Sequence, residues 1–236
     1  MKKLFGVVLL TISFMASAQT NSELLKHYEA YYMQMKTQGD THGIINAMTH
    51  LNVLSPSQAR KDTLAYIYMS ENQYMQALNT IGIKQNASDS DIAVEIKAVS
   101  LKAVKQGELA IGHFEELFKR EQNPLVAYEL AELYIQTKKL AEADKHIAFG
   151  LANSKPDMKK AYYETQTPYE VPLNAAFMYL NAISTYSKDK KVNIDAAVDI
   201  LDAALKEAPN FNLINISKNE LLRQKQALQQ ATQPKN

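Results

Sequence analysis

Helix-breaking residues recur along this chain at an almost constant distance. Pro56, Asp89, Pro124 and Pro156 follow one another at intervals of about 33 residues, close to the period of helical-repeat proteins. Each interval holds two stretches with apolar residues three and four positions apart, split by a short polar break, which is the pattern of two amphipathic helices. One such pair cannot bury its own apolar face, so successive pairs must stack on one another. The repetition therefore predicts an all-α solenoid of helix–turn–helix repeats.

The clearest repeat runs from Leu125 to Pro156, with a polar turn at Lys138-Lys139. Its two helices carry apolar or small residues on one face: Ala127, Leu130, Ala131, Tyr134, Leu140, Ala143, Ile147, Gly150 and Leu151. An earlier repeat shows the same order in Leu64, Ala65, Tyr68, Tyr74, Ala77 and Ile81. Small residues beside the leucines let the two helices of a repeat approach closely, and the tyrosines fill the seam to the next repeat.

This order of residues resembles the tetratricopeptide repeat (TPR), a helix–turn–helix family with a period of about 34 residues. The family pattern has a large apolar residue, a Leu beside a small residue, and a Tyr on the first helix. A turn, an Ala, an aliphatic or aromatic residue and a closing Pro follow. The resemblance implies a right-handed superhelical solenoid whose concave wall is built from successive first helices. It also implies a non-enzymatic scaffold that binds a protein or peptide.

The repeat domain is predicted to span residues 19–210. Its repeats are expected at about 25–57, 58–91, 92–123, 124–156 and 172–209, and the opening repeat is degenerate because Tyr32 stands where a small residue is expected. In the repeat 92–123, Ser100 is assigned to the small position of the first helix. Residues 211–236 are predicted to form a C-terminal capping helix and tail, since an uncovered terminal repeat would expose apolar surface.

An irregular insertion is predicted at 157–171. Pro168 and Pro172 lie four positions apart, and each restricts the residue before it, so a continuous helix is not expected. The segment also carries Tyr162, Tyr163 and Tyr169. These tyrosines could pack the insertion on the solenoid, or the insertion could be a binding loop on a rigid scaffold.

The first residues have the pattern of a secretory signal peptide. Lys2 and Lys3 precede the apolar run 4–15, and Ala16-Ser17-Ala18 has the small-residue pattern of a cleavage site. We expect removal of residues 1–18, with cleavage after Ala18, and a periplasmic or secreted protein of bacterial type. The run is shorter than a spanning helix, and no later window is long enough, so the mature chain is expected to have no transmembrane helix.

Composition disfavours several classes of function. The chain has 26 Lys+Arg against 25 Asp+Glu and no basic block, so nucleic-acid binding is not expected. It has no Cys, which removes thiolate chemistry and thiolate-bound metals. Phosphate-loop, dinucleotide, hydrolase-elbow and zincin motifs are missing from the sequence, so we expect no enzyme activity, no cofactor and no metal. His113 and His146 occupy matching places on successive second helices, where we expect them on the surface.

The TPR resemblance also assigns residues to the concave wall. They are Lys26, Glu29, Met33, Asp62, Tyr66, Met69, Lys97, Leu101, Tyr128, Glu132 and Ile135. Some members grip a peptide's C-terminal carboxylate with Lys and Asn at such places, but Glu29 and Met33 stand at the first two here. Tyr and Met offer adaptable apolar contact that suits a peptide or a partner helix. Alternatively, Met33, Tyr66 and Met69 pack between repeats.

A second hypothesis places binding elsewhere. In it, Tyr162, Tyr163 and Tyr169 of the insertion are stacking platforms for a carbohydrate or cell-wall ligand. The absence of Trp weakens this hypothesis, because the indole ring is the larger platform.

Overall fold

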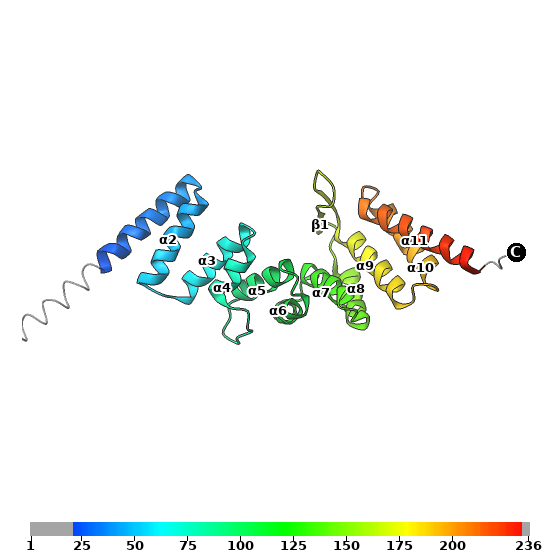
Figure 1. Ribbon diagram of the computed structural model, residues 1–236, viewed down its shortest axis with the longest axis horizontal. Coiled ribbons are helices and arrows are strands. Elements are labelled where there is room, and N and C mark those ends of the chain that lie inside the picture. The colour runs from blue at the N-terminus through cyan, green and yellow to red at the C-terminus, as the bar shows by residue number, and fades with distance from the viewer. Residues whose placement is uncertain (1–20, 233–236) are drawn as a thin grey trace, which may run out of the picture. The chain divides into compact units, whose positions relative to one another are not determined.

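The computed structural model describes residues 21–232, so the predicted signal peptide lies outside the described residues. Helices follow one another along this part of the chain, with one pair of strands between them (Figure 1). The elements are a helix over 21–38, α2 (Thr41–Leu54), α3 (Gln58–Ser70), α4 (Tyr74–Ile81), α5 (Asp91–Ala103), α6 (Gly107–Arg120), α7 (Pro124–Gln136), α8 (Leu140–Asn153), β1 (Lys159–Tyr162), β2 (Tyr169–Pro172), α9 (Leu173–Lys188), α10 (Ile194–Glu207) and α11 (Asn212–Thr232). No helix within residues 21–232 has both the length and the apolar content needed to cross a membrane.

The helices up to α8 begin at evenly spaced positions. First helices α3, α5 and α7 begin at Gln58, Asp91 and Pro124, and the second helices α2, α4, α6 and α8 have the same even spacing. The residue before each of these first helices is Ser57, Ser90 or Asn123. Each of them caps its helix by accepting a hydrogen bond from a backbone N–H in the first turn. Local capping thus sets each helix start.

The turn inside each repeat recurs with the same period. Its central residue has a positive φ: 69° at Gly39, 59° at Asn72, 61° at Lys105 and 61° at Lys138. In each turn, the next N–H donates to the carbonyl five positions earlier, as in Gln106 N–H to Leu101 O at 2.8 Å. This is the Schellman ending of a helix, which usually has glycine at the left-handed position. Here only the first of these four turns has one.

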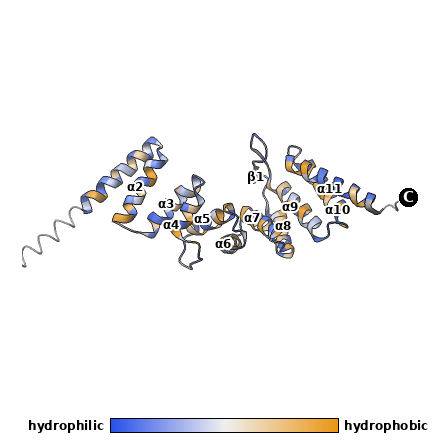
Figure 2. Cartoon of the chain, in the orientation of Figure 1, coloured by the Kyte–Doolittle hydropathy of each residue, from blue (hydrophilic) through white to orange (hydrophobic). Residues whose placement is uncertain are grey.

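The described chain divides into two compact units, which we call unit 1 (residues 21–106) and unit 2 (residues 107–232). In unit 1, one apolar cluster joins Ile45, Met48 and Leu51 of α2 to Leu64 of α3. A second cluster joins α3, α4 and α5 through residues 65, 77 and 96. Polar and apolar residues share each helix (Figure 2), as stacked amphipathic helices require.

Unit 1 also contains an early helix ending. Helix α4 has 8 residues, and the neighbouring first helices α3 and α5 have 13 each. It ends at Gly82, whose φ of 79° favours glycine. A loop, residues 82–90, then leads to α5.

Unit 2 is built on helices α6 to α11 and the strand pair. Gly150 of α8 lets α9 approach closely, because a Cβ atom there would lie 2.0 Å from the Phe177 ring. Helix α9 has 16 residues, against 13 for α7. Helix α11 packs on α10, and Leu201, Phe211 and Ile214 are fully buried in this part of the unit.

The insertion at 157–171 is more regular than predicted. It contains β1 and β2, an antiparallel pair in which Lys159 is opposite Pro172 and Tyr162 is opposite Tyr169. We call residues 159–172 the hairpin. The prediction that the prolines prevent a continuous helix is correct, but the expectation of an irregular segment is wrong. Strand pairing positions Val171 and Tyr162 toward the helices, where both are buried.

Candidate functional site

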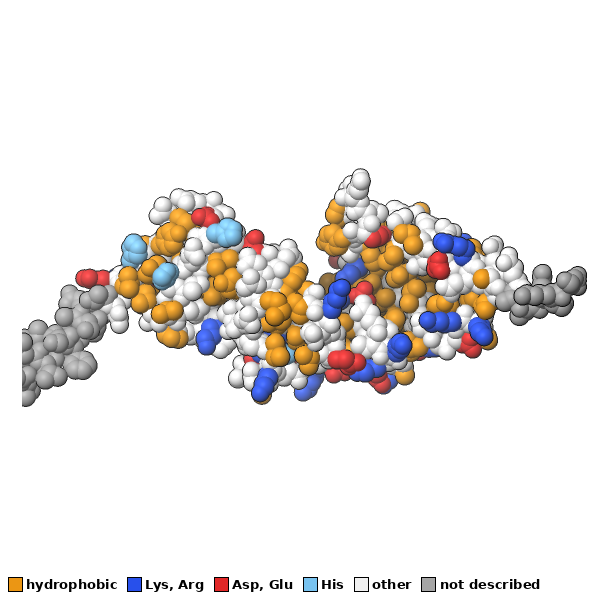
Figure 3. Space-filling model, viewed as in Figure 1, with side chains coloured by type: hydrophobic (Ala, Val, Ile, Leu, Met, Phe, Trp, Pro, Cys, Tyr) orange, Lys and Arg blue, Asp and Glu red, His pale blue; other side chains and the backbone are white. Residues whose placement is uncertain are grey.

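The first helices of unit 1 expose apolar side chains at one repeat position. Met33, Tyr66 and Val99 occupy the same place in three successive repeats, and Met33 and Tyr66 are 58% and 45% exposed. Val99 is partly exposed, and Met69, one turn after Tyr66, packs partly against the cluster of residues 65, 77 and 96. We call Met33, Tyr66, Met69 and Val99 the unit 1 strip. Hydrophobic side chains lie among polar ones on the visible surface of unit 1 (Figure 3).

The helix over 21–38 is held against α3. Tyr28 and Tyr32 pack on the cluster that contains Leu64. Arg60 and Glu29 form an exposed ion pair at 3.4 Å, a contact of little energetic weight. Lys26 and Glu29 are both exposed, two turns and one turn before Met33 on the same helix, and their assignment to the wall stays a prediction.

Asp62 does not lie on an open wall, which corrects its prediction. Its residue exposure is 6%, and both carboxylate oxygens accept hydrogen bonds, from Gln58 Nε2 at 2.7 Å and from Ser90 Oγ at 2.8 Å. Ser90 also caps α5. Asp62 therefore ties α3 to the start of α5.

Lys97 and Leu101 are also buried, at 0% and 2% exposure, against the prediction. The repeat period explains the error. Lys97 stands one period from both Leu64 and Leu130, two buried leucines of the neighbouring first helices, and Leu101 stands at the position of Tyr134 in the seam. Assigning Ser100 to the small position shifts the register, because Ala98 occupies that position.

Lys97 is a charged residue at a leucine position, and the loop 82–90 supplies its partners. Its Nζ lies 2.6 Å from Asp89 Oδ2 and donates to Lys84 O at 2.8 Å. Burial acts to raise the pKa of Asp89, but the hydrogen bond and charge of Lys97, together with hydrogen bonds from Asn86, lower that pKa below 3.8. The buried ion pair fixes the loop on α5.

Tyr128 of α7 is 1% exposed, so its prediction as a wall residue is wrong as well. The hairpin covers it: its hydroxyl is 2.7 Å from that of Tyr162, and Lys160 Nζ lies 4.8 Å from its ring centroid. Phe177 packs edge-on at 5.5 Å. Burial, with the nearby Tyr162 hydroxyl and the charge of Glu132, raises the pKa of Tyr128 well above 10.0.

The three insertion tyrosines do not form one exposed platform. Tyr162 is buried and stacks on Tyr169 at 5.8 Å, and both rings contact Phe211. Burial and the Glu164 carboxylate raise the pKa of Tyr169 to about 12. Tyr163 is 73% exposed. Since only one ring is open, this arrangement does not favour the carbohydrate hypothesis.

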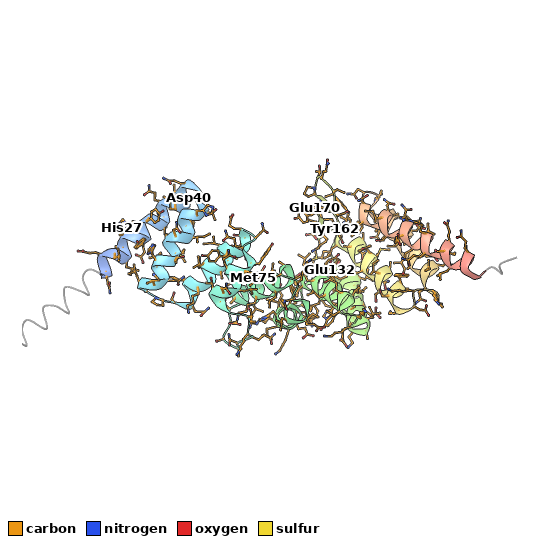
Figure 4. The ribbon with its side chains drawn as sticks, viewed as in Figure 1. His27, Asp40, Met75, Glu132, Tyr162 and Glu170 are labelled. Atoms are coloured by element: carbon orange, nitrogen blue, oxygen red, sulfur yellow. The ribbon has the colours of Figure 1, made fainter. Side chains whose placement is uncertain are left out.

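Glu132 and Ile135 are partly exposed on α7, compatible with their prediction. Figure 4 shows Glu132 on α7 and Tyr162 in the hairpin, close to each other in this view. The charge of Glu132 also acts on Tyr179 of α9, whose pKa burial raises. Sequence reasoning missed Tyr179 and Val99. The repeat period counted from Tyr66 points to Val99, whereas Tyr179 follows an insertion that interrupts the period.

The two histidines differ from the surface positions predicted for them. His113 is 2% exposed. His146 is partly buried, stacked on Tyr134 at 5.7 Å with the Phe118 ring edge-on at 5.0 Å. Burial lowers the pKa of His146, against the charges of Glu115 and Glu142. Within residues 21–232, no group of three or more His, Asp or Glu side chains could hold a metal ion.

Comparison with known proteins identifies the fold. No protein-family model matches the chain, and no curated protein sequence matches it. Among solved structures, a tetratricopeptide repeat protein from Parabacteroides merdae is similar, with a TM-score of 0.63 and 15% identity over 88% of this chain and 76% of that one.

Two other solved structures are also similar to this chain. YrrB, described as a TPR protein with an unusual peptide-binding site, has a TM-score of 0.64 and 14% identity over 87% of this chain and 97% of its own. MamA has a TM-score of 0.56 and 15% identity over 79% and 92%. The chain therefore has the TPR fold, and the predicted all-α solenoid of TPR-like repeats is confirmed.

Proposed function

We propose that this protein is a non-enzymatic interaction scaffold that binds a peptide or partner protein on the first helices of unit 1. The observation that carries the proposal is the exposure of Met33 and Tyr66 at the same position of successive repeats. If Met33 and Tyr66 served to pack helices together, their side chains would be buried, as the side chain of Leu64 is. Exposed apolar residues in a row are typical of an interaction surface.

The unit 1 strip suits an apolar partner surface. Methionine is flexible and polarizable, and tyrosine adds a large ring with a polar edge, so both adapt to different side chains. Lys26, Glu29 and Arg60 beside it carry charges of both signs. We therefore expect an amphipathic helix or a short peptide with apolar anchors and a mixed polar rim.

The similar solved structures support this proposal by analogy of fold. YrrB is described as having a peptide-binding site, and this chain shares its fold. A shared fold does not fix a ligand, so the strip has to be tested by itself.

The test is capture of partners by the purified protein, with a photo-reactive group at the exposed residue 70, one turn after Tyr66 on α3, in every variant. The variant Met33→Ala with Tyr66→Ala should lose the captured proteins. The matched control is Met75→Ala, because Met75 is 55% exposed on second helix α4. Equal capture by both variants and the unchanged protein would exclude the unit 1 strip as the binding surface.

We further propose that the scaffold works in the bacterial cell envelope or outside the cell. This part rests on the charged start, the apolar run and the Ala16-Ser17-Ala18 pattern. Fractionation of cells followed by N-terminal sequencing should find a mature chain that starts at Gln19. A chain in the cytosol that keeps residues 1–18 would overturn the proposed location.

A further inference from the structure

The open edge of β1 leads to an inference about unit 2 that is independent of the unit 1 strip. We infer that β1 pairs with an extended segment of a partner protein, which adds as a third, antiparallel strand. The edge is defined by the backbone of Lys159, Ala161 and Tyr163, and we call it the β1 edge. Three features support the pairing: the direction of hydrogen-bonding groups, side-chain fit and charge.

Backbone directions follow from two hydrogen bonds at the hairpin. Leu173 N–H donates to Met158 O at 2.9 Å, so these two residues form a hydrogen-bonded pair of the antiparallel ladder. Hydrogen-bonded and non-hydrogen-bonded pairs alternate along such a ladder, so the carbonyl of Glu170 should point away from β1. It does, because it accepts a hydrogen bond from Asn210 Nδ2, a residue outside the hairpin, at 3.3 Å. Because Ala161 is opposite Glu170, the N–H and C=O of Ala161 point away from β2.

The same alternation directs the backbone groups of Lys159 and Tyr163 outward. Among residues 21–232, none of these N–H and C=O groups has a hydrogen-bond partner. The other side of the pair is different, since β2 is contacted by Asn210 and by Leu213, whose N–H donates to the Tyr169 hydroxyl. Of the two described strands, β1 therefore offers a row of unpaired backbone groups, which is a template for another strand.

Lysines on edge strands often prevent such pairing, so their directions matter. Lys160 Nζ is 2.6 Å from Glu129 Oε1 and lies over the Tyr128 ring, so its charge faces α7. Lys159 pairs with Glu170 at 3.7 Å, but both side chains are 59% exposed, and a pair so exposed contributes little. A partner carboxylate can replace Glu170 there.

The outer side chains of the β1 edge define the partner's residues. Ala161 is small and lies between Lys159 and the exposed Tyr163. From side-chain size we expect the outer face to be lower at Ala161 than at these neighbours, and we call this lower place the notch. A large apolar residue opposite Ala161 would fill this notch and contact the Tyr163 ring. Two positions further along, opposite Lys159, an Asp or Glu would form a cross-strand ion pair.

A second copy of the chain fits this edge less well. Self-pairing centred on Ala161 would set alanine opposite alanine and leave the notch empty. The registers on one side would set Lys160 opposite Lys160, or Lys159 opposite Lys159, and like charges directly opposite are destabilising. The registers on the other side, centred on Tyr162 or Tyr163, would have to pair β1 with residues 164–167, which are bent and not extended. The partner is therefore a different polypeptide, with a large apolar residue two positions before an acidic one.

A labelled, end-capped peptide, Thr-Val-Thr-Phe-Thr-Glu-Thr, tests the inference with the full chain. Paired as described, its Phe meets Ala161 and its Glu meets Lys159. Fluorescence anisotropy should show saturable binding, and amide exchange should slow at Lys159, Ala161 and Tyr163. An N-methyl group on the Phe nitrogen should weaken binding at least about tenfold, because it removes a pairing donor. An N-methyl group on the following Thr, whose N–H points away from β1, should not.

Two variants supply the protein side of the test. Ala161→Pro removes the outward N–H without breaking a bond to β2, and it should also weaken binding at least about tenfold. Lys159→Glu should weaken binding of this peptide and strengthen binding of the same peptide with Lys in place of Glu. Circular dichroism and amide exchange of α7 would verify that both variants fold.

Several outcomes would overturn the inference. One is the absence of saturable binding, and another is equal binding of the two N-methylated peptides. Loss of binding in Met33→Ala with Tyr66→Ala would place the peptide on the unit 1 strip. Self-association that disappears in Ala161→Pro would assign the β1 edge to a second copy.

Discussion

Tyr66 in unit 1 and Tyr128 in unit 2 are tyrosines of first helices with opposite surroundings, since Tyr66 is 45% exposed and Tyr128 is 1% exposed. The two residues stand at different repeat positions, since Tyr128 corresponds to Asp62 of α3, and each unit also adds a different segment to its repeats. Unit 1 adds the loop 82–90, which binds the charged Lys97 and leaves the apolar strip open. Unit 2 adds the hairpin, which covers the aromatic ring. The helices set the possible surface, and the insertions decide which part of it remains exposed.

The largest expected effect is from Tyr128→Ala. The variant loses the packing of a buried aromatic ring and leaves the Tyr162 hydroxyl without this partner, so we expect a loss of about 3–5 kcal/mol in the free energy of unfolding. Urea unfolding followed by circular dichroism measures the loss, and amide exchange should quicken in α7 and the hairpin. The control is Tyr163→Ala in the exposed turn, which should change stability by less than about 0.5 kcal/mol. A loss below about 1 kcal/mol in Tyr128→Ala would contradict the packing of Tyr128 under the hairpin.

The second largest loss of stability is expected from Lys97→Ala, which leaves Asp89 without its buried partner Lys97. We expect a loss of about 2–3 kcal/mol, below the usual cost for a buried pair because Asp89 lies nearer the surface. Amide exchange should quicken in α5 and around the loop 82–90. Glu95→Ala, at an exposed position of the same helix, is the control.

The double variant Lys97→Leu with Asp89→Asn sharpens this result. It restores the leucine found at the same position in α3 and α7 and removes both charges, so most of the stability should return. If it is as unstable as Lys97→Ala, then shape rather than charge holds the loop.

Alkaline pH should weaken unit 2 by a smaller amount. The folded-state pKa values of Tyr128 and Tyr162 are raised above 10.0, so their contribution is complete below pH 10 and is lost as the pH rises above it. At about pH 10.5, each should remove less than about 1 kcal/mol. Urea unfolding at about pH 9 and about pH 10.5 measures the change. A variant with both tyrosines changed to Phe should lose less stability between these pH values. If the two proteins lost the same free energy of unfolding, Tyr128 and Tyr162 would not be the cause of the pH dependence.

The smallest expected effect on stability is from Tyr66→Ala. Its side chain is half exposed, so we expect a loss of less than about 1 kcal/mol by urea unfolding. Partner capture should nevertheless fall, unlike in the Met75→Ala control. A stability loss as large as that of Tyr128→Ala would remove the contrast between the two units.

The repeated part of the fold follows from local features of the sequence. Ser57, Ser90 and Asn123 cap their helices by contacts within the same turn, and apolar spacing marks the faces that stack. Such signals are local and can be predicted. The hairpin depends on pairing 159–162 with 169–172, and neither KKAY nor YEVP alternates clearly between polar and apolar residues. Its proline pattern therefore predicted a break but not strands.

The candidate site was only partly predictable for a similar reason. Met33 and Tyr66 follow directly from their repeat position, and both are exposed. The prediction for Lys97 was wrong because a lysine is normally expected on the surface. Its burial depends on partners in the loop 82–90, which the repeat pattern does not reveal. The burial of Tyr128 likewise depends on a later segment of the chain, the hairpin that carries Tyr162.

The left-handed turns at Asn72, Lys105 and Lys138 have an implication for excised fragments of this protein. Lys105 and Lys138 are in a conformation that costs a lysine about 1 kcal/mol, while Asn72 tolerates it better than other non-glycine residues, so the two lysine turns do not favour their own geometry. A single helical hairpin cut out of the chain should therefore unravel at this point, and only neighbours on both sides would keep it bent. Exchanging these three residues for glycine offers a route to shorter arrays that survive in isolation.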